Sequence, residues 1–347
     1  MVSLRDVAES VATIETCIAA PACFAGVRHA RERNPFLGWA TMGIETHRYR
    51  LRDVVLDCDH MVLLKDGRII AETNYLQSPE ALSALRVRPE SLVHPNVRHP
   101  VAICFDHWSS NYFHWMAHAV PTLHAVGRDY PRGDVVLLVP ALTSWQSATI
   151  GLLGTPHLHR LEWAPGRQFH LAQLDYYDYV AGRADYALSP LSRAAYARMT
   201  AAAEPGPAQR RKLYIDRGDH ANRRIPNEAE LVGKLLERGF VAVRPETLTL
   251  PEQVALFANA AMVVAQLGAG LANIAFCRPG AIVYELLAEH HQNPCFLAMA
   301  MQGNLLYWGD VFATGVAASS HTTAWDAEID IAWVLARVAE LERLLPP

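Results

Sequence analysis

The chain has 347 residues, of which 51% are hydrophobic and 19% are charged. These values are typical of a soluble globular protein, and the length allows two domains of ordinary size. The formal net charge of −4 is spread over both signs without a long basic run, which argues against a nucleic-acid-binding protein.

The six cysteines and the N-terminal residues indicate a cellular location. No two cysteines form a CxxC pair, so we expect reduced thiols in a reducing compartment. Acidic residues interrupt residues 1–17 where a signal peptide needs an apolar core, and no apolar stretch is long enough for a transmembrane helix. We therefore expect a cytoplasmic protein, although the apolar residues 18–27 could contact the inner face of a membrane.

The first two thirds of the chain predict two regions. Residues 1–95 are expected to form a β-rich N-terminal segment, because short apolar runs alternate with turn signals such as the KDG at 65–67. Residues 96–204 are expected to form an α/β domain, with strands near 101–105 and 134–140 and helices near 111–120, 144–153 and 189–203. The segment 201–211, with two prolines, is the best candidate for a linker.

Strands and helices alternate regularly over residues 205–322. Strands are expected near 212–216, 240–243, 262–266 and 281–287, with amphipathic helices between them and loops of only a few residues. This order is typical of parallel βαβ units in a Rossmann-like domain. The tail, 323–347, is expected to be one more helix.

Glycines directly after a buried strand predict an anion-binding turn. Gly268, Ala269 and Gly270 follow the strand that ends near Gln266, and the helix after them would direct its free N–H groups at a ligand. Glu285, expected at the end of the next strand, could accept hydrogen bonds from ribose hydroxyls. Tight strand–helix packing is the alternative, and leucine at 271 disfavours a nicotinamide dinucleotide.

Three arginines lie in one predicted strand-to-helix loop. Arg217, Arg223 and Arg224 stand between a strand and a helix, where guanidinium groups could neutralise a diphosphate. The alternative is a solvated basic loop.

The segment 105–124 contains four histidines and two tryptophans. A metal-dependent hydrolase that binds its ion through His107, His114 and His118 is one interpretation. Packing is the alternative for His118. His114 and Asp106, which follows a predicted strand, are the two candidates for a general base. Two acidic stretches, 57–59 and 175–178, look like metal-binding acids but are interpreted as a loop and a polar aromatic edge.

Several of these residues together resemble the family-61 glycosyltransferases, which include bacterial capsular polysaccharide biosynthesis proteins. The resemblance covers residues 214–287, and Asn111 to Trp115 are similar to an upstream stretch of that family. The family often has histidine where this chain has Leu267. The positions that carry the resemblance are Arg217, Arg223, Arg224, Asn227, Glu228, Gly239, Phe240, Pro245, Glu246, Glu252, Gln253, Phe257, Gly268, Ala269, Gly270, Asn273, Pro279 and Gly280.

The resemblance implies an α/β protein of GT-B type, with two Rossmann-like domains facing a cleft. It implies inverting transfer of a sugar from a nucleotide-sugar donor, expected to be UDP-linked, to a saccharide or lipid-linked saccharide acceptor in cell-surface glycan synthesis. No metal or other cofactor is expected. A non-catalytic nucleotide-sugar-binding or glycan-binding protein of the same fold remains an alternative, and the oligomeric state is not predicted.

The same resemblance assigns the two substrates to different parts of the chain. Residues 96–204 would bind the acceptor, with Asn111 and Trp115 on that side and His114 or Asp106 as the base. Residues 205–322 would bind the donor through Arg217, Arg223, Arg224, Gly268, Ala269, Gly270, Asn273 and Glu285.

Overall fold

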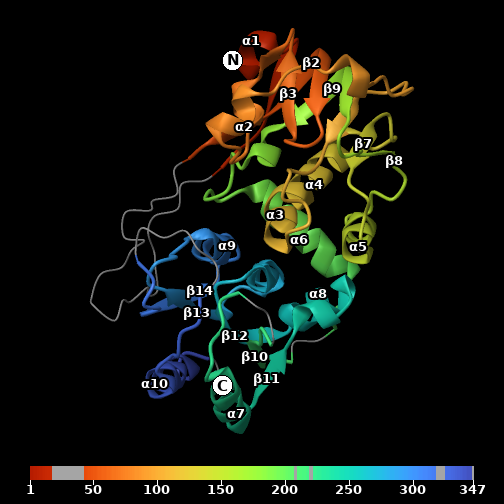
Figure 1. The fold of residues 1–347 in the computed structure, drawn as a ribbon. Helices are drawn as coiled ribbons and strands as arrows, with labels where there is room; N and C mark the ends of the chain where they lie inside the picture. The colour runs from red at the N-terminus through yellow and green to blue at the C-terminus, as the bar shows by residue number, and fades with distance from the viewer. Residues whose placement is uncertain (18–42, 207–208, 219–221, 318–324, 346–347) are drawn as a thin grey trace. The chain divides into compact units, whose positions relative to one another are not determined.

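The computed structural model describes residues 1–17, 43–206, 209–218, 222–317 and 325–345 (Figure 1). The chain divides into two compact units. Unit 1 contains residues 1–18 and 42–199, and unit 2 contains residues 19–41 and 200–347. Both units mix strands with helices, so the predicted α/β class is confirmed. Residues 18–27, considered for membrane contact, lie outside the described residues.

Unit 1 is built on one mixed sheet with the order β4-β3-β2-β9-β6-β7-β8, with β1 added at β2 and β5 at β9. The N-terminal strands pair antiparallel, and β9 pairs antiparallel with β2 but parallel with β6. The strands are β1 (Ser10–Thr16), β2 (Glu45–Asp57), β3 (Val62–Lys65), β4 (Arg68–Ile69), β5 (Leu92–Val93), β6 (Val101–Ile103), β7 (Val136–Val139), β8 (His159–Glu162) and β9 (Gln168–Tyr177).

Local sequence explains several of these elements. The predicted turn between β3 and β4 forms, because Asp66 (φ 51°) and Gly67 (φ 72°) adopt the left-handed conformation that a two-residue hairpin requires. Thr143 begins one helix with a capping box to Gln146. The helices of unit 1 are α1 (Leu4–Val7), η1 (Ala71–Thr73), α2 (Pro79–Ser83), η2 (Pro89–Ser91), α3 (Tyr112–His114), η3 (Trp115–Ala119), α4 (Val120–Asp129), α5 (Ser144–Leu152), η4 (Asp178–Ala181) and α6 (Pro190–Ala202).

The strand β9 joins the two halves of this sheet. It lies between β2, from the β-rich segment expected at 1–95, and β6, from the α/β region expected at 96–204. These two regions therefore share one sheet. The interpretation of residues 175–178 as a polar edge is wrong, because Asp175 is fully buried in β9, where Arg50 donates to it at 3.0 Å.

Unit 2 is built on a five-stranded parallel sheet with the order β11-β10-β12-β13-β14. The strands predicted for this region all form, and one further strand, β14, extends the sheet. They are β10 (Arg211–Ile215), β11 (Phe240–Val243), β12 (Ala260–Gln266), β13 (Ile282–Ala288) and β14 (Leu306–Phe312).

Helices pack on both faces of the unit 2 sheet. On one face, Leu231 and Leu235 of α7 and Val338 of α10 share a core with Tyr214 and Tyr284 of the sheet. On the other face, η6 contacts both α8 and α9. The helices are α7 (Glu228–Glu237), η5 (Pro245–Thr247), α8 (Leu250–Ala258), η6 (Ala269–Phe276), α9 (Cys295–Gln302) and α10 (Ile331–Glu342). Among the described residues, no helix combines the length and the apolar character needed to cross a membrane.

Candidate active site

The first candidate site forms where β6 of unit 1 ends. Asp106 follows this strand with its side chain buried, and its Oδ2 atom is the hydrogen-bond acceptor for two imidazoles. Nδ1 of His114 lies 3.3 Å from it and Nδ1 of His118 lies 2.5 Å from it. The backbone N–H of Trp108 donates to the other oxygen, Oδ1, at 2.6 Å. Both oxygens of this carboxylate are therefore held.

A π-helical turn places the two histidines on one side of their helix. Asn111 caps the first turn, since its side chain accepts from the N–H of Phe113 at 2.9 Å. The π turn η3 follows and runs into Pro121, which has no N–H to donate to the carbonyl of Met116. Tyr196 of α6 donates its hydroxyl to that carbonyl instead, at 2.9 Å. The helix was predicted, but its π turn was not.

Two residues that the sequence did not single out complete the cluster. Asp185, which follows β9 and η4, faces the second ring nitrogen of His118, with 2.6 Å between its Oδ1 and Nε2. Tyr75 donates its hydroxyl to the other oxygen of Asp185 at 3.1 Å. The Tyr75 ring also lies edge-on to His118, with 4.8 Å between centroids, and to His114, with 5.6 Å.

The cluster is strongly polarised. Both nitrogens of His118 face carboxylate oxygens, so both act as donors, which is the imidazolium form. Burial acts to lower the pKa of His118, but Asp185 and Asp106 outweigh it and raise this pKa to about 9. Burial acts to raise the pKa of Asp106, but the hydrogen bonds from His114 and His118 hold it well below its ordinary value.

Sheet topology explains why these groups meet. The chain runs from β6 to β7 to β8 in one direction, whereas β9 lies on the other side of β6. The gap between β6 and β9 is a topological switch point, and parallel sheets bind ligands beside the carboxyl ends of the strands at such a point. Asp106 follows β6 and Asp185 follows β9, so both come from this edge.

The same side chains could hold a metal ion. One ligand atom each from Asp106, His114 and His118 all lie within 4.8 Å of one another, and two imidazoles with one carboxylate are a set that zinc accepts. The sequence had grouped His107 with the two histidines. The structure groups Asp106 with them instead, and burial lowers the pKa of His107.

The predicted acceptor-side residues have different surroundings. Trp115 is only 1% exposed, and its indole N–H donates to the hydroxyl of Thr149 at 3.1 Å. Asn111 is exposed and serves as the helix cap described above. The exposed aromatic ring beside His114 is Trp108, which is 47% exposed and stacks on the imidazole with 5.9 Å between centroids.

A second candidate site forms at the switch point of the unit 2 sheet. The chain leaves β10 toward β11 on one side and passes from β12 to β13 and β14 on the other, so this point lies between β10 and β12. The loop after β10 carries Arg217, and the loop after β12 carries Gly268. The guanidinium group lies so close to this glycine that an added Cβ would be 2.3 Å from its Nη1 atom. The two predicted donor loops therefore meet.

Arg223 and Arg224, the neighbouring arginines of the same loop, have different surroundings. Arg223 adopts a positive φ of 62° and donates from Nη1 to the carbonyl of Leu267 at 2.9 Å, directly before Gly268. Arg224 is exposed instead, and its Nη1 lies 3.6 Å from a carboxylate oxygen of Asp326. Arg217 and Arg223 are both partly buried, and burial lowers the pKa of each. These two are the cations beside the glycine turn.

The helix predicted after the glycine turn forms, as a 3₁₀ helix. Gly268 has extended backbone, and η6 begins at Ala269. Gly270 has ordinary contact distances around it, with Pro245 Cγ 3.5 Å from an added Cβ. Asn273 is fully buried in η6, and its amide donates to Gln253 of α8 and to the carbonyl of Gly270, each at 3.0 Å. These two hydrogen bonds hold the turn together.

Glu285 lies in the middle of β13 and not at its end, contrary to the sequence prediction. It is fully buried, and its Oε2 accepts from the hydroxyl of Tyr307 in β14 at 2.5 Å. Burial raises the pKa of Glu285 to about 8, although Tyr307 and the nearby Arg223 act in the opposite direction. Its other oxygen has no hydrogen-bond partner among the described residues.

Two further buried polar atoms lie near these loops. Among the described residues, Nε of Arg217 and Oε1 of Gln266 make no hydrogen bond. Gln266 donates from its other side-chain atom to the carbonyl of Arg223 at 2.9 Å. Buried polar atoms without partners are uncommon in folded proteins and often mark a place where a ligand or water binds.

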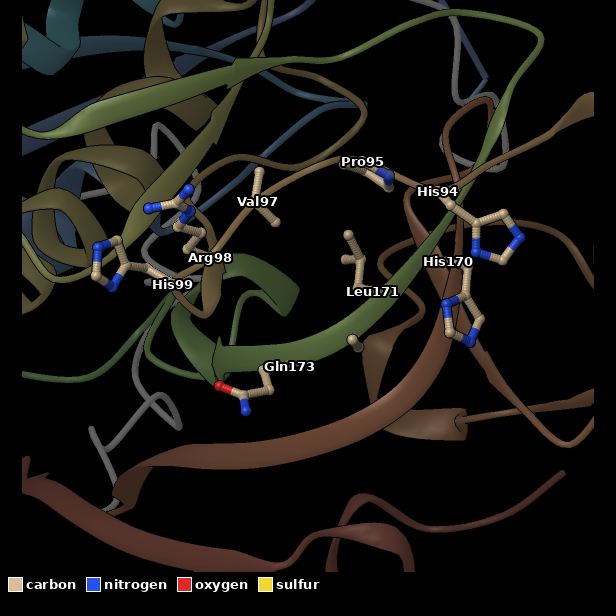
Figure 2. A pocket seen from close by; sticks show the side chains of 9 residues that line it. His94, Pro95, Val97, Arg98, His99, His170, Leu171 and Gln173 are labelled. Carbon is tan, nitrogen blue, oxygen red and sulfur yellow. The ribbon is translucent and has the colours of Figure 1, made fainter.

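A cavity of about 360 Å³ lies elsewhere in unit 1, between the segment 94–99 and β9. Figure 2 shows this segment running apart from β9, with His94 and His170 together at one end of the gap and Arg98 and His99 at the other. None of the predicted site residues lines it. The cavity is therefore separate from the Asp106 cluster.

The chain also matches the model of a known protein family. The family model described as Glycosyltransferase 61 matches residues 112–284. The chain belongs to glycosyltransferase family 61. No curated protein matches the chain. The matched range of this glycosyltransferase includes His114, Asp185 and Arg217, whereas Asp106 and Glu285 lie outside it.

Two site residues of this glycosyltransferase could not be found from sequence spacing. Tyr75 and Asp185 are 110 residues apart and come together only because β9 lies beside the N-terminal strands. Asp185 lies in a loop whose sequence contains no recognisable motif. The exposure of Trp108 also depends on the turn after β6 and was not predicted.

Proposed function

We propose that this glycosyltransferase is an inverting enzyme that moves a sugar from a nucleotide-sugar, expected to be UDP-linked, to a hydroxyl of a saccharide or lipid-linked saccharide. The observation that carries this proposal is the meeting of Arg217, Arg223 and the Gly268 turn at the switch point of a parallel sheet. We further propose that it works in the cytoplasm in the synthesis of a cell-surface glycan.

The unit 2 loops have the chemistry that a leaving diphosphate needs. Negative charge develops on the diphosphate as the bond to the sugar breaks, and fixed cationic donors lower the barrier by meeting that charge. Arg217 and Arg223 can each offer several N–H donors to phosphate oxygens. Two guanidinium groups would supply this charge without a metal ion.

The cluster in unit 1 suits the base that inversion requires. A single group must take the proton from the acceptor hydroxyl as its oxygen attacks the anomeric carbon. The Asp106 carboxylate at 3.3 Å favours the tautomer of His114 with its proton on Nδ1, which leaves Nε2 as the acceptor. We therefore assign His114 as the base and Asp106 as the residue that orients it.

The two units would be the two halves of a GT-B transferase. Each contains parallel strands with polar groups at a switch point, which fits the two Rossmann-like halves that the family resemblance implies. Unit 1 would bind the acceptor and unit 2 the donor.

The donor proposal is tested by thermal shift with a panel of UDP-, GDP- and CMP-sugars in the presence of EDTA. At least one sugar nucleotide should raise the melting temperature, and Arg223→Ala should remove that shift. Arg224→Ala is the matched comparison, because its side chain pairs with Asp326 and we expect a smaller effect.

Two outcomes would contradict the proposal in different ways. A flat response to the whole panel would reject nucleotide-sugar binding. Binding without release of nucleotide, tested with a set of saccharide acceptors, would favour a non-catalytic member of the family.

A further inference from the structure

The proposed reaction leaves His118 and Asp185, a charged pair in the unit 1 cluster, without a role. His118 is 1% exposed, and Asp185 is 15% exposed in its side chain. They come from different elements, and no property of the helix alone requires a charged pair here. Burying an ionised pair is costly unless both partners are held by hydrogen bonds. A function in the site would explain why these groups are present.

We propose that His118 is a positioning residue: by bridging Asp106 and Asp185, it holds the Asp106 carboxylate in the orientation that keeps His114 able to accept a proton. The inference rests on the proposed function, because it requires His114 to be the base.

The contacts form one continuous chain of hydrogen bonds. Tyr75 donates to Asp185, Asp185 accepts from His118, and His118 donates to the same Asp106 oxygen that His114 approaches. Rotation of the Asp106 carboxylate would break its contact with His118 at 2.5 Å and also move the partner of His114. The orientation of His114 therefore depends on His118.

Charge gives the bridge a second effect. The titratable groups that face His118 are Asp106, Asp185, His114 and Tyr75. With His118 as a cation, the buried Asp106 and the partly buried Asp185 share one positive charge between them. That shared charge strengthens both hydrogen bonds of the bridge.

Two substitutions separate the two arms of the bridge. In His118→Asn, the amide nitrogen occupies about the place of Nδ1 and can still donate to Asp106. In His118→Gln, the amide nitrogen reaches about the place of Nε2 and can donate only to Asp185. Both remove the positive charge and both leave a polar group of similar size. If His118 only filled space, His118→Asn would not preserve the orientation of His114 better than His118→Gln does.

The experiment is ¹⁵N NMR of the full chain labelled at histidine, which reports the tautomer of His114 without any substrate. In the native chain we expect the Nδ1–H form. His118→Asn should keep most of that form, whereas His118→Gln and Asp185→Asn should shift His114 toward the other tautomer. His124→Gln, on α4 outside the cluster, is the control and should leave the His114 signals unchanged.

Kinetics add a second readout. Measured as UDP release from the UDP-sugar that gives the largest thermal shift, kcat of His118→Gln should fall about tenfold to a hundredfold with KM nearly constant. His118→Asn should retain a larger share of the native kcat. Asp185→Asn, at a more exposed position, keeps the test available if a substitution at His118 prevents folding.

Three results would overturn the inference. One is a folded His118→Gln protein whose His114 signals match those of the native chain. The second is a loss in His118→Asn equal to that in His118→Gln. The third is stoichiometric zinc or iron in the purified protein that disappears on substitution of His118, since the histidine would then be a ligand. Failure of nucleotide-sugar binding alone would reject the proposed function but leave the NMR result standing.

Discussion

Tyr307 of β14 donates its hydroxyl to Glu285 of β13 over 2.5 Å, and both side chains are buried within the sheet of unit 2. The carboxyl is therefore favoured in its neutral form, because burial outweighs the effect of Tyr307 and Arg223 on its pKa. This pair gives the chain a stability that depends on pH.

The first prediction concerns Glu285→Gln. The pKa of Glu285 is about 8 in the folded chain and about 4.3 in an unfolded chain. Its contribution to stability is thus fully present below about pH 4.3 and is lost as pH rises through about 8. Glutamine cannot ionise. The free energy of unfolding of the variant should therefore rise relative to that of the native chain as pH rises, by about 3–5 kcal/mol near pH 8.5.

Urea unfolding at pH 5.5, 7 and 8.5 measures this difference. A constant difference between Glu285→Gln and the native chain over this range would contradict the prediction. Tyr307→Phe is a useful comparison, because it removes the donor to Oε2 but leaves the ionisable acid in place.

The second prediction concerns the pair of carboxylates around His118. The pKa of His118 is about 9 in the folded chain and about 6.5 in an unfolded chain. This raised pKa contributes stability that is complete below about pH 6.5 and is lost as pH rises through about 9, in total about 3 kcal/mol.

Asp185→Asn should therefore cost more stability at pH 6 than at pH 9.5. Chemical unfolding of the variant and the native chain at both values checks the sign. Equal costs at the two values would show that Asp185 does not hold the imidazolium. His124→Gln should not cost more stability at pH 6 than at pH 9.5, because His124 lies outside the cluster.

The third prediction concerns Gly268→Ala. Gly268 has a φ of −177°, which any residue adopts, so the substitution introduces no backbone strain. Its Cβ would lie 2.3 Å from Nη1 of Arg217, so the guanidinium must move. Loss of one charge-assisted hydrogen bond to phosphate should weaken nucleotide-sugar binding about tenfold to a hundredfold.

Calorimetric titration of the sugar nucleotide measures this loss. Gly233→Ala in α7 is the control, because an added Cβ there meets nothing within 4 Å. Unchanged affinity in a correctly folded Gly268→Ala variant would show that Arg217 does not bind the donor.

The fourth prediction separates two tryptophans near His114. Trp115 is buried and hydrogen-bonded to Thr149, so Trp115→Ala should destabilise the chain by about 3–5 kcal/mol. Trp108 is exposed and stacks on His114, so Trp108→Ala should change stability by less than about 0.5 kcal/mol.

Trp108 should affect the acceptor instead. Its exposed ring beside the proposed base could stack on a sugar ring, and its loss should raise the acceptor KM about threefold to tenfold. Thermal unfolding and acceptor kinetics on the two variants distinguish these effects. A large loss of stability in Trp108→Ala would contradict the assignment.

Local patterns in the sequence predicted the elements of unit 2 well. Strands and helices there follow one another closely, and Gly239 ends α7 with a φ of 78°, as expected of a glycine after a helix. Local patterns also predicted the helix that carries His114. In these cases the residues that determine the element lie close to it in the sequence.

Interactions between distant residues were not predicted. Asn227 lies directly before α7, but its side chain does not cap that helix and exchanges hydrogen bonds with the backbone of Ile329 at 2.8 and 3.1 Å. Glu285 was expected at a strand end, but the pairing of β13 with β14 extends the strand to Ala288. Asp185 enters the cluster only through the position of β9. Each outcome depends on which strands become neighbours, and a single sequence does not show that pairing.

The position of β9 between β2 and β6 has a consequence for the order of folding. Residues 45–57 and 101–103 find their common partner only when residues 168–177 are present. During synthesis, β2 must therefore wait for 111 residues and β6 for 65 residues before β9 begins and the sheet can close, and pairing over such separations is slow. We expect that a fragment ending before residue 168 would expose unpaired strand edges and aggregate, whereas one ending after α6 could fold.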